Sequence, residues 1–94
     1  MPKGYVVVTE DIKDPEGIKA YMAEAAKSFS PEIKILAMDA GAEFVEGDAK
    51  GQVVLMEFET LEAAKAWYYS DGYQKALPLR QAAADCQLAF FSGF

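Results

Sequence analysis

Three of the strands that the sequence predicts are apolar on both of their faces, and this feature limits the folds open to the chain. In the strand predicted for Gly4–Glu10, Val6 and Val8 point to one side and Val7 points to the other. The same double apolarity holds for the strands predicted at Gln52–Phe58 and Cys86–Ser92. An antiparallel sheet with one face in water alternates apolar and polar residues. We therefore expect both faces of this sheet to be covered.

Helices are predicted between these strands. The first begins at Asp14, which can cap free N–H groups ahead of Pro15 at the first helical position, and continues to Phe29. Thr60 is the expected cap of a second helix. A further helical segment begins at Asp71 with a pattern similar to a capping box, and Pro78 is expected to kink or restart it.

The order of elements predicts a ferredoxin-like α+β fold. The remaining strand is expected at Ile33–Ala40, with a continuation through a bend at Gly41 to Glu46. The order β-α-β-β-α-β gives a four-stranded antiparallel sheet with two helices on one face, the second helix kinked or split. We expect a second copy to cover the other face, sheet against sheet, in a homodimer. A partner protein or a ligand on that face is the alternative, and the pattern leaves open which side of each strand faces the helices.

Composition excludes several kinds of site. The chain has 94 residues, no His and 1 Cys, which removes imidazole bases, almost every zinc site and an internal disulfide. The 15 acidic residues against 9 basic ones oppose nucleic acid as a partner. Glu43, Glu46 and Asp48 lack calcium-loop spacing, so we expect a solvated turn there. We expect a single cytoplasmic domain over residues 1–94, with no metal, cofactor, nucleic-acid partner or membrane contact.

Several motifs along the chain resemble a known family. They are Gly4-Tyr5, Asp14-Pro15-Glu16, Glu46-Gly47-Asp48, Val54-Leu55-Met56-Glu57-Phe58, Leu61 to Tyr68, Ser70-Asp71-Gly72-Tyr73-Gln74 and Leu79-Arg80. The chain resembles the domain-of-unknown-function family thirteen-thirty, within the dimeric α+β barrel superfamily. The resemblance covers nearly the whole chain and implies the ferredoxin-like fold and the sheet-to-sheet dimer, with no established activity.

The resemblance also carries a departure. Superfamily relatives include cofactor-independent monooxygenases, muconolactone-isomerase-like proteins and haem-dependent enzymes. Because this chain has no His, we do not expect it to resemble the haem-dependent enzymes in function. Family members often carry a positive charge near the second strand, where this chain has Met38 and Asp39. If that charge helps to hold an anionic ligand in the family, this chain binds a different ligand or none.

Candidate site residues lie mainly between Trp67 and Arg80. Arg80 is the only Arg and suits bidentate binding of a carboxylate, or else a structural ion pair. Tyr73 could donate a hydrogen bond to a carbonyl or enolate oxygen, and Trp67 could wall a flat pocket, although both also suit a core. Ser70 offers a pocket hydroxyl or a helix-ending turn. Glu57 could act as a base or pair with a cation at its strand end.

Two functions fit these residues. The first is a cofactor-independent enzyme or binder of a small organic anion or carbonyl compound, with Arg80, Tyr73 and Glu57 as candidate catalytic residues. The second is a non-catalytic dimeric structural or interaction module. Convergence of Arg80 and Tyr73 on a concavity would favour the first function, whereas internal hydrogen bonds that occupy both side chains would favour the second.

Overall fold

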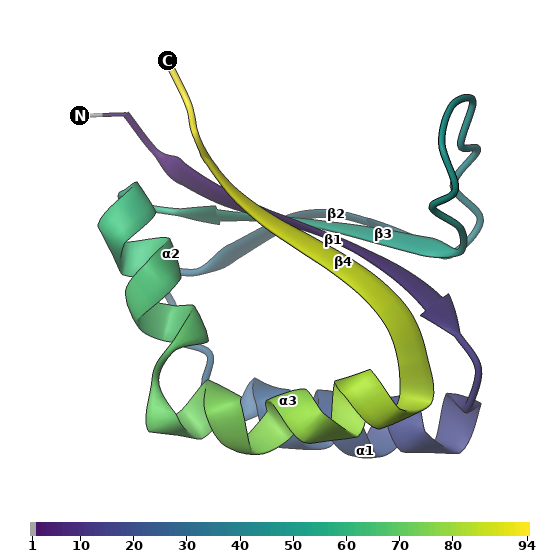
Figure 1. The fold of residues 1–94 in the computed structure, drawn as a ribbon. Coiled ribbons are helices and arrows are strands. Elements are labelled where there is room, and N and C mark those ends of the chain that lie inside the picture. The colour runs from purple at the N-terminus through teal and green to yellow at the C-terminus, as the bar shows by residue number, and fades with distance from the viewer. Residues whose placement is uncertain (1) are drawn as a thin grey trace.

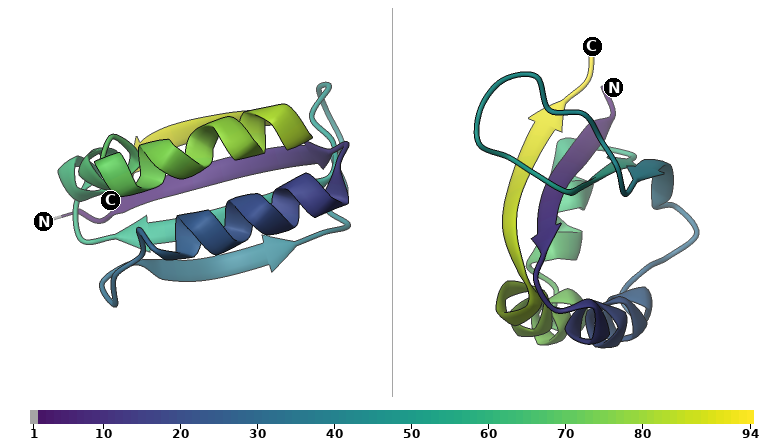
Figure 2. Two further views of the ribbon diagram at one scale, coloured as in Figure 1. Left: turned by 90° about the horizontal axis from the view of Figure 1, so that it is seen from below. Right: turned by 90° about the vertical axis from the view of Figure 1, so that its right-hand side faces the viewer.

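The computed structural model describes residues 2–94 and has a ferredoxin-like architecture, as expected (Figure 1). Its elements are β1 (Gly4–Ile12), α1 (Pro15–Ala26), β2 (Lys34–Asp39), β3 (Gln52–Phe58), α2 (Leu61–Tyr68), α3 (Asp71–Ala83) and β4 (Ala84–Ser92). The strands form one antiparallel sheet in the order β2-β3-β1-β4. All three helices lie on the same side of the sheet, with α1 below the β2–β3 half and α3 below the β1–β4 half (Figure 2).

Side-chain burial identifies the strand positions that face the helices. In β1 the side chains of Val6 and Val8 are buried, whereas that of Val7 between them lies on the other side of the sheet. The cross-strand register carries this division through the sheet, so that even-numbered residues of β1, β3 and β4 form the helix face. The opposite side, here called the open face, is built around Tyr5, Val7, Val53, Leu55, Ala89 and Phe91.

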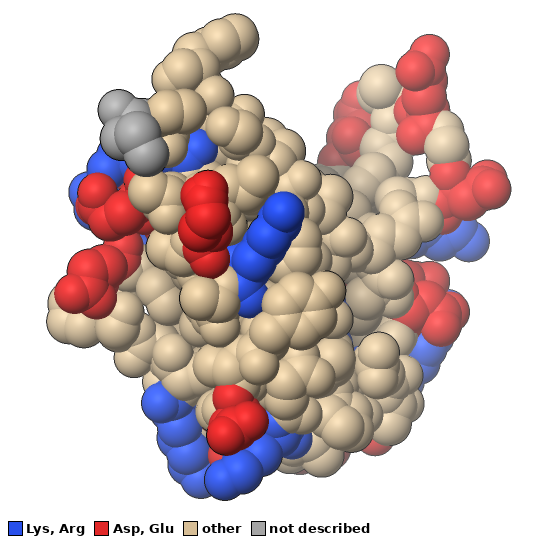
Figure 3. Space-filling model, turned by 60° about the vertical axis from the view of Figure 1, so that its left-hand side comes forward, with Lys and Arg blue, Asp and Glu red and all other residues tan. Residues whose placement is uncertain are grey.

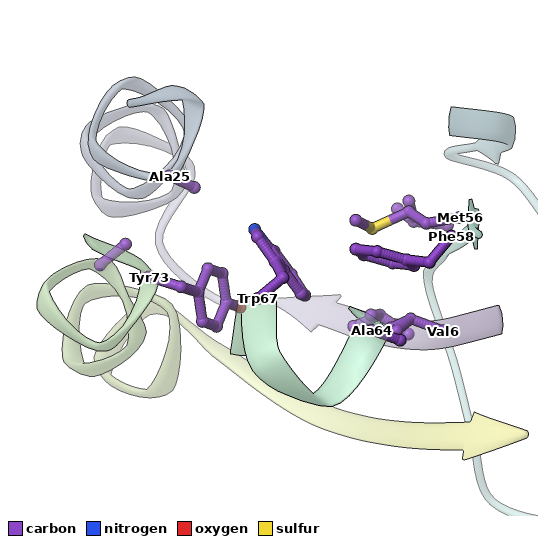
Figure 4. Close-up of a cluster of buried hydrophobic side chains, with 10 residues drawn as sticks. Val6, Ala25, Met56, Phe58, Ala64, Trp67 and Tyr73 are labelled. Atoms are coloured by element: carbon purple, nitrogen blue, oxygen red, sulfur yellow. The ribbon is translucent and has the colours of Figure 1, made fainter. Parts of the chain in front are cut away.

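Aromatic side chains dominate the core between the helix face and the helices. Trp67 of α2 lies 4.2 Å from Tyr73 of α3 and 5.5 Å from Phe58 of β3, measured between ring centroids. Figure 4 shows the indole ring between these two neighbours. Because large aromatic rings bury much apolar area, this row of side chains holds α2 and α3 against the sheet.

The segment between β2 and β3 departs from the prediction. The expected strand through Gly41 to Glu46 is not formed, because β2 ends at Asp39, whose carboxylate accepts a hydrogen bond from the Gly41 N–H at 2.9 Å. Such an Asx turn offers the backbone an alternative to the sheet ladder. Residues 40–51 then form a loop that projects from the sheet away from the helices (Figure 1), with acidic side chains crowded on it (Figure 3).

The helix ends also differ from expectation. Helix α3 continues unbroken through Pro78, since its buried face from Tyr73 to Ala83 holds it in place. Its cap is Ser70 rather than Asp71, and the Ser70 hydroxyl accepts a hydrogen bond from the Tyr73 N–H at 3.3 Å. Helices α2 and α3 are therefore separated at Ser70, which matches the expectation that the second helix is kinked or split.

The predicted N-terminal cap of α1 is not formed by its side chain, whereas that of α2 is. Asp14 stands at the N-cap of α1 but its side chain makes no capping hydrogen bond, and the helix ends at Ala26 rather than Phe29. At α2 the Thr60 hydroxyl accepts a hydrogen bond from the Ala63 N–H at 3.0 Å, as expected.

Candidate functional site

A cavity of about 190 Å³ lies between the helix face of the sheet and helix α1. Its walls are mostly apolar, and Trp67 is part of its lining. Met22 and Phe29 from the α1 side and Ile35 and Met38 from β2 line it while each remains more than a third exposed. These four side chains therefore mark the mouth of the cavity, between α1 and the edge strand β2.

Two tyrosine hydroxyl groups meet inside the cavity. Tyr21 of α1 and Tyr73 of α3 both line it, and their hydroxyl oxygens are 2.8 Å apart. When one hydroxyl donates to another, the accepting hydroxyl keeps its own proton for a further hydrogen bond. The pair therefore presents one O–H donor to a bound molecule.

The surroundings keep both tyrosines protonated at neutral pH. Burial raises the pKa of Tyr21, and its hydrogen bond to Tyr73 raises it further. Burial also raises the pKa of Tyr73, whereas its hydrogen bond with Tyr21 and the charge of Arg80 oppose that rise. Both groups therefore act as neutral hydrogen-bond donors.

Arg80 lies behind this pair without a partner for its charge. It is 4% exposed, and its Nε and Nη1 atoms have no hydrogen-bond partner. It does not line the cavity, yet its charge favours the ionised forms of Tyr21, Tyr73 and Cys86 and so opposes the rise in their pKa values, which places the guanidinium near all three, between α3 and the sheet. The ion pairs formed within the described residues do not include Arg80. A buried cation without a contact partner is costly to the fold and is typical of functional sites.

The sequence analysis missed Glu10, which is the carboxylate of the cavity. Glu10 is 5% exposed, and its Oε1 accepts a hydrogen bond from the Gln52 Nε2 group at 2.8 Å. Gly51, with a φ of 87°, lets the preceding turn approach the main-chain oxygen of Glu10 where a side chain would collide. The signal was present in β1, because period-two alternation places Glu10 on the same face as Val6 and Val8.

Trp67 and Ser70 occupy adjoining but different positions. Trp67 lines the cavity, and its Nε1–H donates to the Ser28 hydroxyl at 3.1 Å. Ser70 faces a second groove on the far side of Trp67, donates to the Trp67 carbonyl at 2.6 Å and caps α3. Trp67 thus stands at the cavity, whereas the Ser70 hydroxyl serves the junction between α2 and α3.

Glu57 lies on the open face of the sheet, away from the cavity. Its Oε2 accepts a hydrogen bond from the Tyr5 hydroxyl at 3.3 Å, and this carboxylate raises the pKa of Tyr5 in addition to the effect of burial. The structure therefore brings Tyr73 and Trp67 to one cavity with Arg80 behind them, and it does not bring Glu57 there.

Residues 2–94 hold neither a cluster of metal ligands nor a helix suited to a membrane. Within that range, no group of three or more His, Cys, Asp or Glu side chains is arranged to hold a metal ion. None of the helices in the same range has the length and apolar character needed to cross a membrane.

The fold and the cavity together define a ferredoxin-like α+β protein with a mostly apolar internal cavity. The family model described as Domain of unknown function (DUF1330) matches residues 3–94, and the chain belongs to this family. The resemblance stated from the motifs is thereby confirmed. No curated protein matches the sequence.

Solved structures share the fold at low sequence identity. A protein of unknown function from Rhodopseudomonas palustris is 17% identical, with a TM-score of 0.77 over 99% of this chain and 83% of its own. A dimeric ferredoxin-like protein of unknown function from Thermobifida fusca is 15% identical, with a TM-score of 0.67 over 97% and 91%. SnoaB, a cofactor-independent oxygenase from Streptomyces nogalater, is 12% identical, with a TM-score of 0.70 over 100% and 95%.

Proposed function

We propose that the protein binds a small neutral carbonyl compound in the cavity between the sheet and α1, without a cofactor. The observation that carries the proposal is the Tyr21–Tyr73 hydroxyl pair, which offers one O–H donor inside an otherwise mostly apolar space. Sites for small molecules are commonly apolar with a few polar groups that fix orientation. The charge of Arg80 behind the pair strengthens this donor toward an oxygen that gains negative charge.

Charge favours a carbonyl compound over an organic anion. Of the described residues that line the cavity, Glu10 carries a carboxylate and none is a Lys or Arg. Like charges at close range in a poorly solvated space repel strongly. Arg80, which suited a carboxylate in the sequence analysis, stands outside the lining and acts through Tyr73. We therefore assign the ligand's oxygen to the tyrosine pair.

We further propose that the working form is a homodimer joined through the open face. The apolar centre of this face, around Val7 and Leu55, is ringed by polar side chains such as Glu57 and Gln87, as in a typical interface. The structurally similar Thermobifida fusca protein is described as dimeric, which supports the proposal. A cytoplasmic location and a single domain over residues 1–94 stay predictions from composition and length.

The binding proposal is tested by titration of Trp67 fluorescence. Trp67 is the only Trp and lines the cavity, so its emission reports occupancy directly. Three probes of similar shape separate the contributions of the carbonyl oxygen and of negative charge to binding. Phenylacetone has a carbonyl group, propylbenzene has no oxygen, and phenylacetate is an anion. We expect phenylacetone to bind most tightly and phenylacetate most weakly.

Tyr73→Phe and Tyr21→Phe provide the matched variants. Because either hydroxyl alone keeps an O–H donor, the variant that carries both substitutions should weaken phenylacetone by about 3- to 10-fold, the range for one net hydrogen bond, and leave propylbenzene unchanged. Unchanged propylbenzene binding also shows that the variant is folded with its cavity intact. Equal binding of phenylacetone and propylbenzene by the unmodified protein would refute the carbonyl proposal. Absence of binding by all three probes would favour the non-catalytic dimeric module.

A further inference from the structure

Glu10 is a buried carboxylate that no cation touches. Its one side-chain hydrogen bond comes from the neutral amide of Gln52. The next residue, Asp11, is more exposed and pairs with Lys13 at 2.9 Å. A buried charge held by a neutral donor costs folding free energy that an apolar residue would not. Such an unneutralised group in a cavity indicates a role beyond stability.

The position of Glu10 complements the tyrosine pair. Glu10 projects from β1 on the sheet side of the cavity, whereas Tyr21 and Tyr73 project from α1 and α3 on the helix side. One side therefore offers a proton acceptor and the other a hydrogen-bond donor backed by the positive charge of Arg80. A carbonyl compound between them can place its oxygen at the tyrosines and its neighbouring C–H bond at the carboxylate.

We propose that Glu10 is a catalytic base that removes a proton from the carbon next to the bound carbonyl group, an inference that rests on the proposed function. The C–H electron pair forms the new C=C bond, and the carbonyl π electrons move to oxygen to give an enolate. The Tyr21–Tyr73 donor stabilises that oxygen, with Arg80 supplying positive charge behind it. Return of the proton from Glu10 to carbon completes the cycle, so the step needs no oxidant, reductant or metal.

The cavity limits the substrate class to small neutral ketones or aldehydes that carry an acidic C–H bond beside the carbonyl. A volume of about 190 Å³ with mainly apolar walls suits one ring or a short branched chain. Trp67 offers a flat aromatic surface in the cavity lining. An aryl ketone such as phenylacetone meets these requirements, because its aryl group both fills apolar space and acidifies the adjacent CH₂ group.

The test follows exchange of the CH₂ protons of phenylacetone for deuterium in D₂O by proton NMR. The unmodified protein should accelerate the loss of this signal over buffer alone. Glu10→Gln should lower the protein-catalysed rate by about 100-fold or more, the usual contribution of a positioned base. The control is Glu62→Gln, the same substitution on the exposed surface of α2, which should leave the rate unchanged.

Binding measured on the same samples separates the two proposals. Glu10→Gln should still quench Trp67 fluorescence on addition of phenylacetone, since the tyrosine pair remains. Retained exchange in Glu10→Gln, or tight binding by the unmodified protein with no exchange above buffer, would overturn the role of Glu10 and leave the binding site standing. Failure of the unmodified protein to bind phenylacetone would reject both. Should Glu10→Gln not fold, Gln52→Leu, which removes the hydrogen bond that positions the carboxylate, should lower the exchange rate instead.

Discussion

The two faces of the sheet are both apolar but differ in where they place charge. On the helix face, Glu10 and the nearby Arg80 are buried without an ion-pair partner. On the open face, Glu57 lies at the margin and accepts a hydrogen bond from the Tyr5 hydroxyl. Apolar content alone therefore does not distinguish a face built for a ligand from one built for association. Buried charged residues without an ion-pair partner distinguish the two faces.

Substitution of two adjacent residues by Asp should have the largest effects and tests this difference between the faces. Val54 is 8% exposed on the helix face, whereas Leu55 lies on the open face. Val54→Asp buries a carboxylate in the core at a cost of several kcal/mol, comparable with the total stability of a small domain. We expect it to abolish folding, and Leu55→Asp to give a folded monomer. Circular dichroism and light scattering after size exclusion measure the two outcomes.

A third substitution controls for the added charge. Gln81→Asp places the same carboxylate on the exposed side of α3, away from the open face, and should remain a folded dimer. A Leu55→Asp protein that stays dimeric would show that the copies associate elsewhere. The edge strand β2, exposed along its length, would then be the next surface to test.

Alanine substitutions of two phenylalanines, one on each face, should have effects of intermediate size on the free energy of unfolding. Phe58 is 3% exposed and packs on Trp67, whereas Phe91 is 42% exposed and stacks on Tyr5 of the open face. In the Leu55→Asp background, Phe58→Ala should cost about 3–5 kcal/mol of unfolding free energy. Phe91→Ala should cost only about 1 kcal/mol there, because a large part of its surface is already in water. Urea unfolding monitored by circular dichroism gives both values, and equal losses would mean that the open face carries part of the monomer's core.

The sequence predicted most of the architecture because local signals agreed with one another. The strand at Gln52–Phe58, the cap at Thr60 and the helix break at Ser70 all match the structure. The failures arose where a tertiary contact or a short turn decides the outcome. Pro78 stays helical because the buried face of α3 holds it, and the Asp39 turn ends β2 before Gly41.

The site was only partly predictable for a related reason. Tyr73, Trp67 and Arg80 share one chain segment, so motif spacing found them. Glu10 and Tyr21 join them only through the packing of β1 and α1 against that segment, which no local pattern encodes. Alternation along β1 marks Glu10 as inward-facing only after one knows that Val6 and Val8 face the helices.

Cys86 gives the smallest expected effect and reports on the charge of Arg80. This thiol lies on the helix face of β4, where burial raises its pKa and the charge of Arg80 partly lowers it. A raised pKa leaves less thiolate at a given pH, so the native protein should react with iodoacetamide several-fold more slowly than free cysteine. Unfolding in urea should restore the rate of free cysteine. Arg80→Gln should slow the native reaction further, because it removes a positive charge that favours the thiolate. An unchanged rate in folded Arg80→Gln would mean that the guanidinium charge does not reach this side of the sheet, and the electrostatic support proposed for the tyrosine pair would lose its basis.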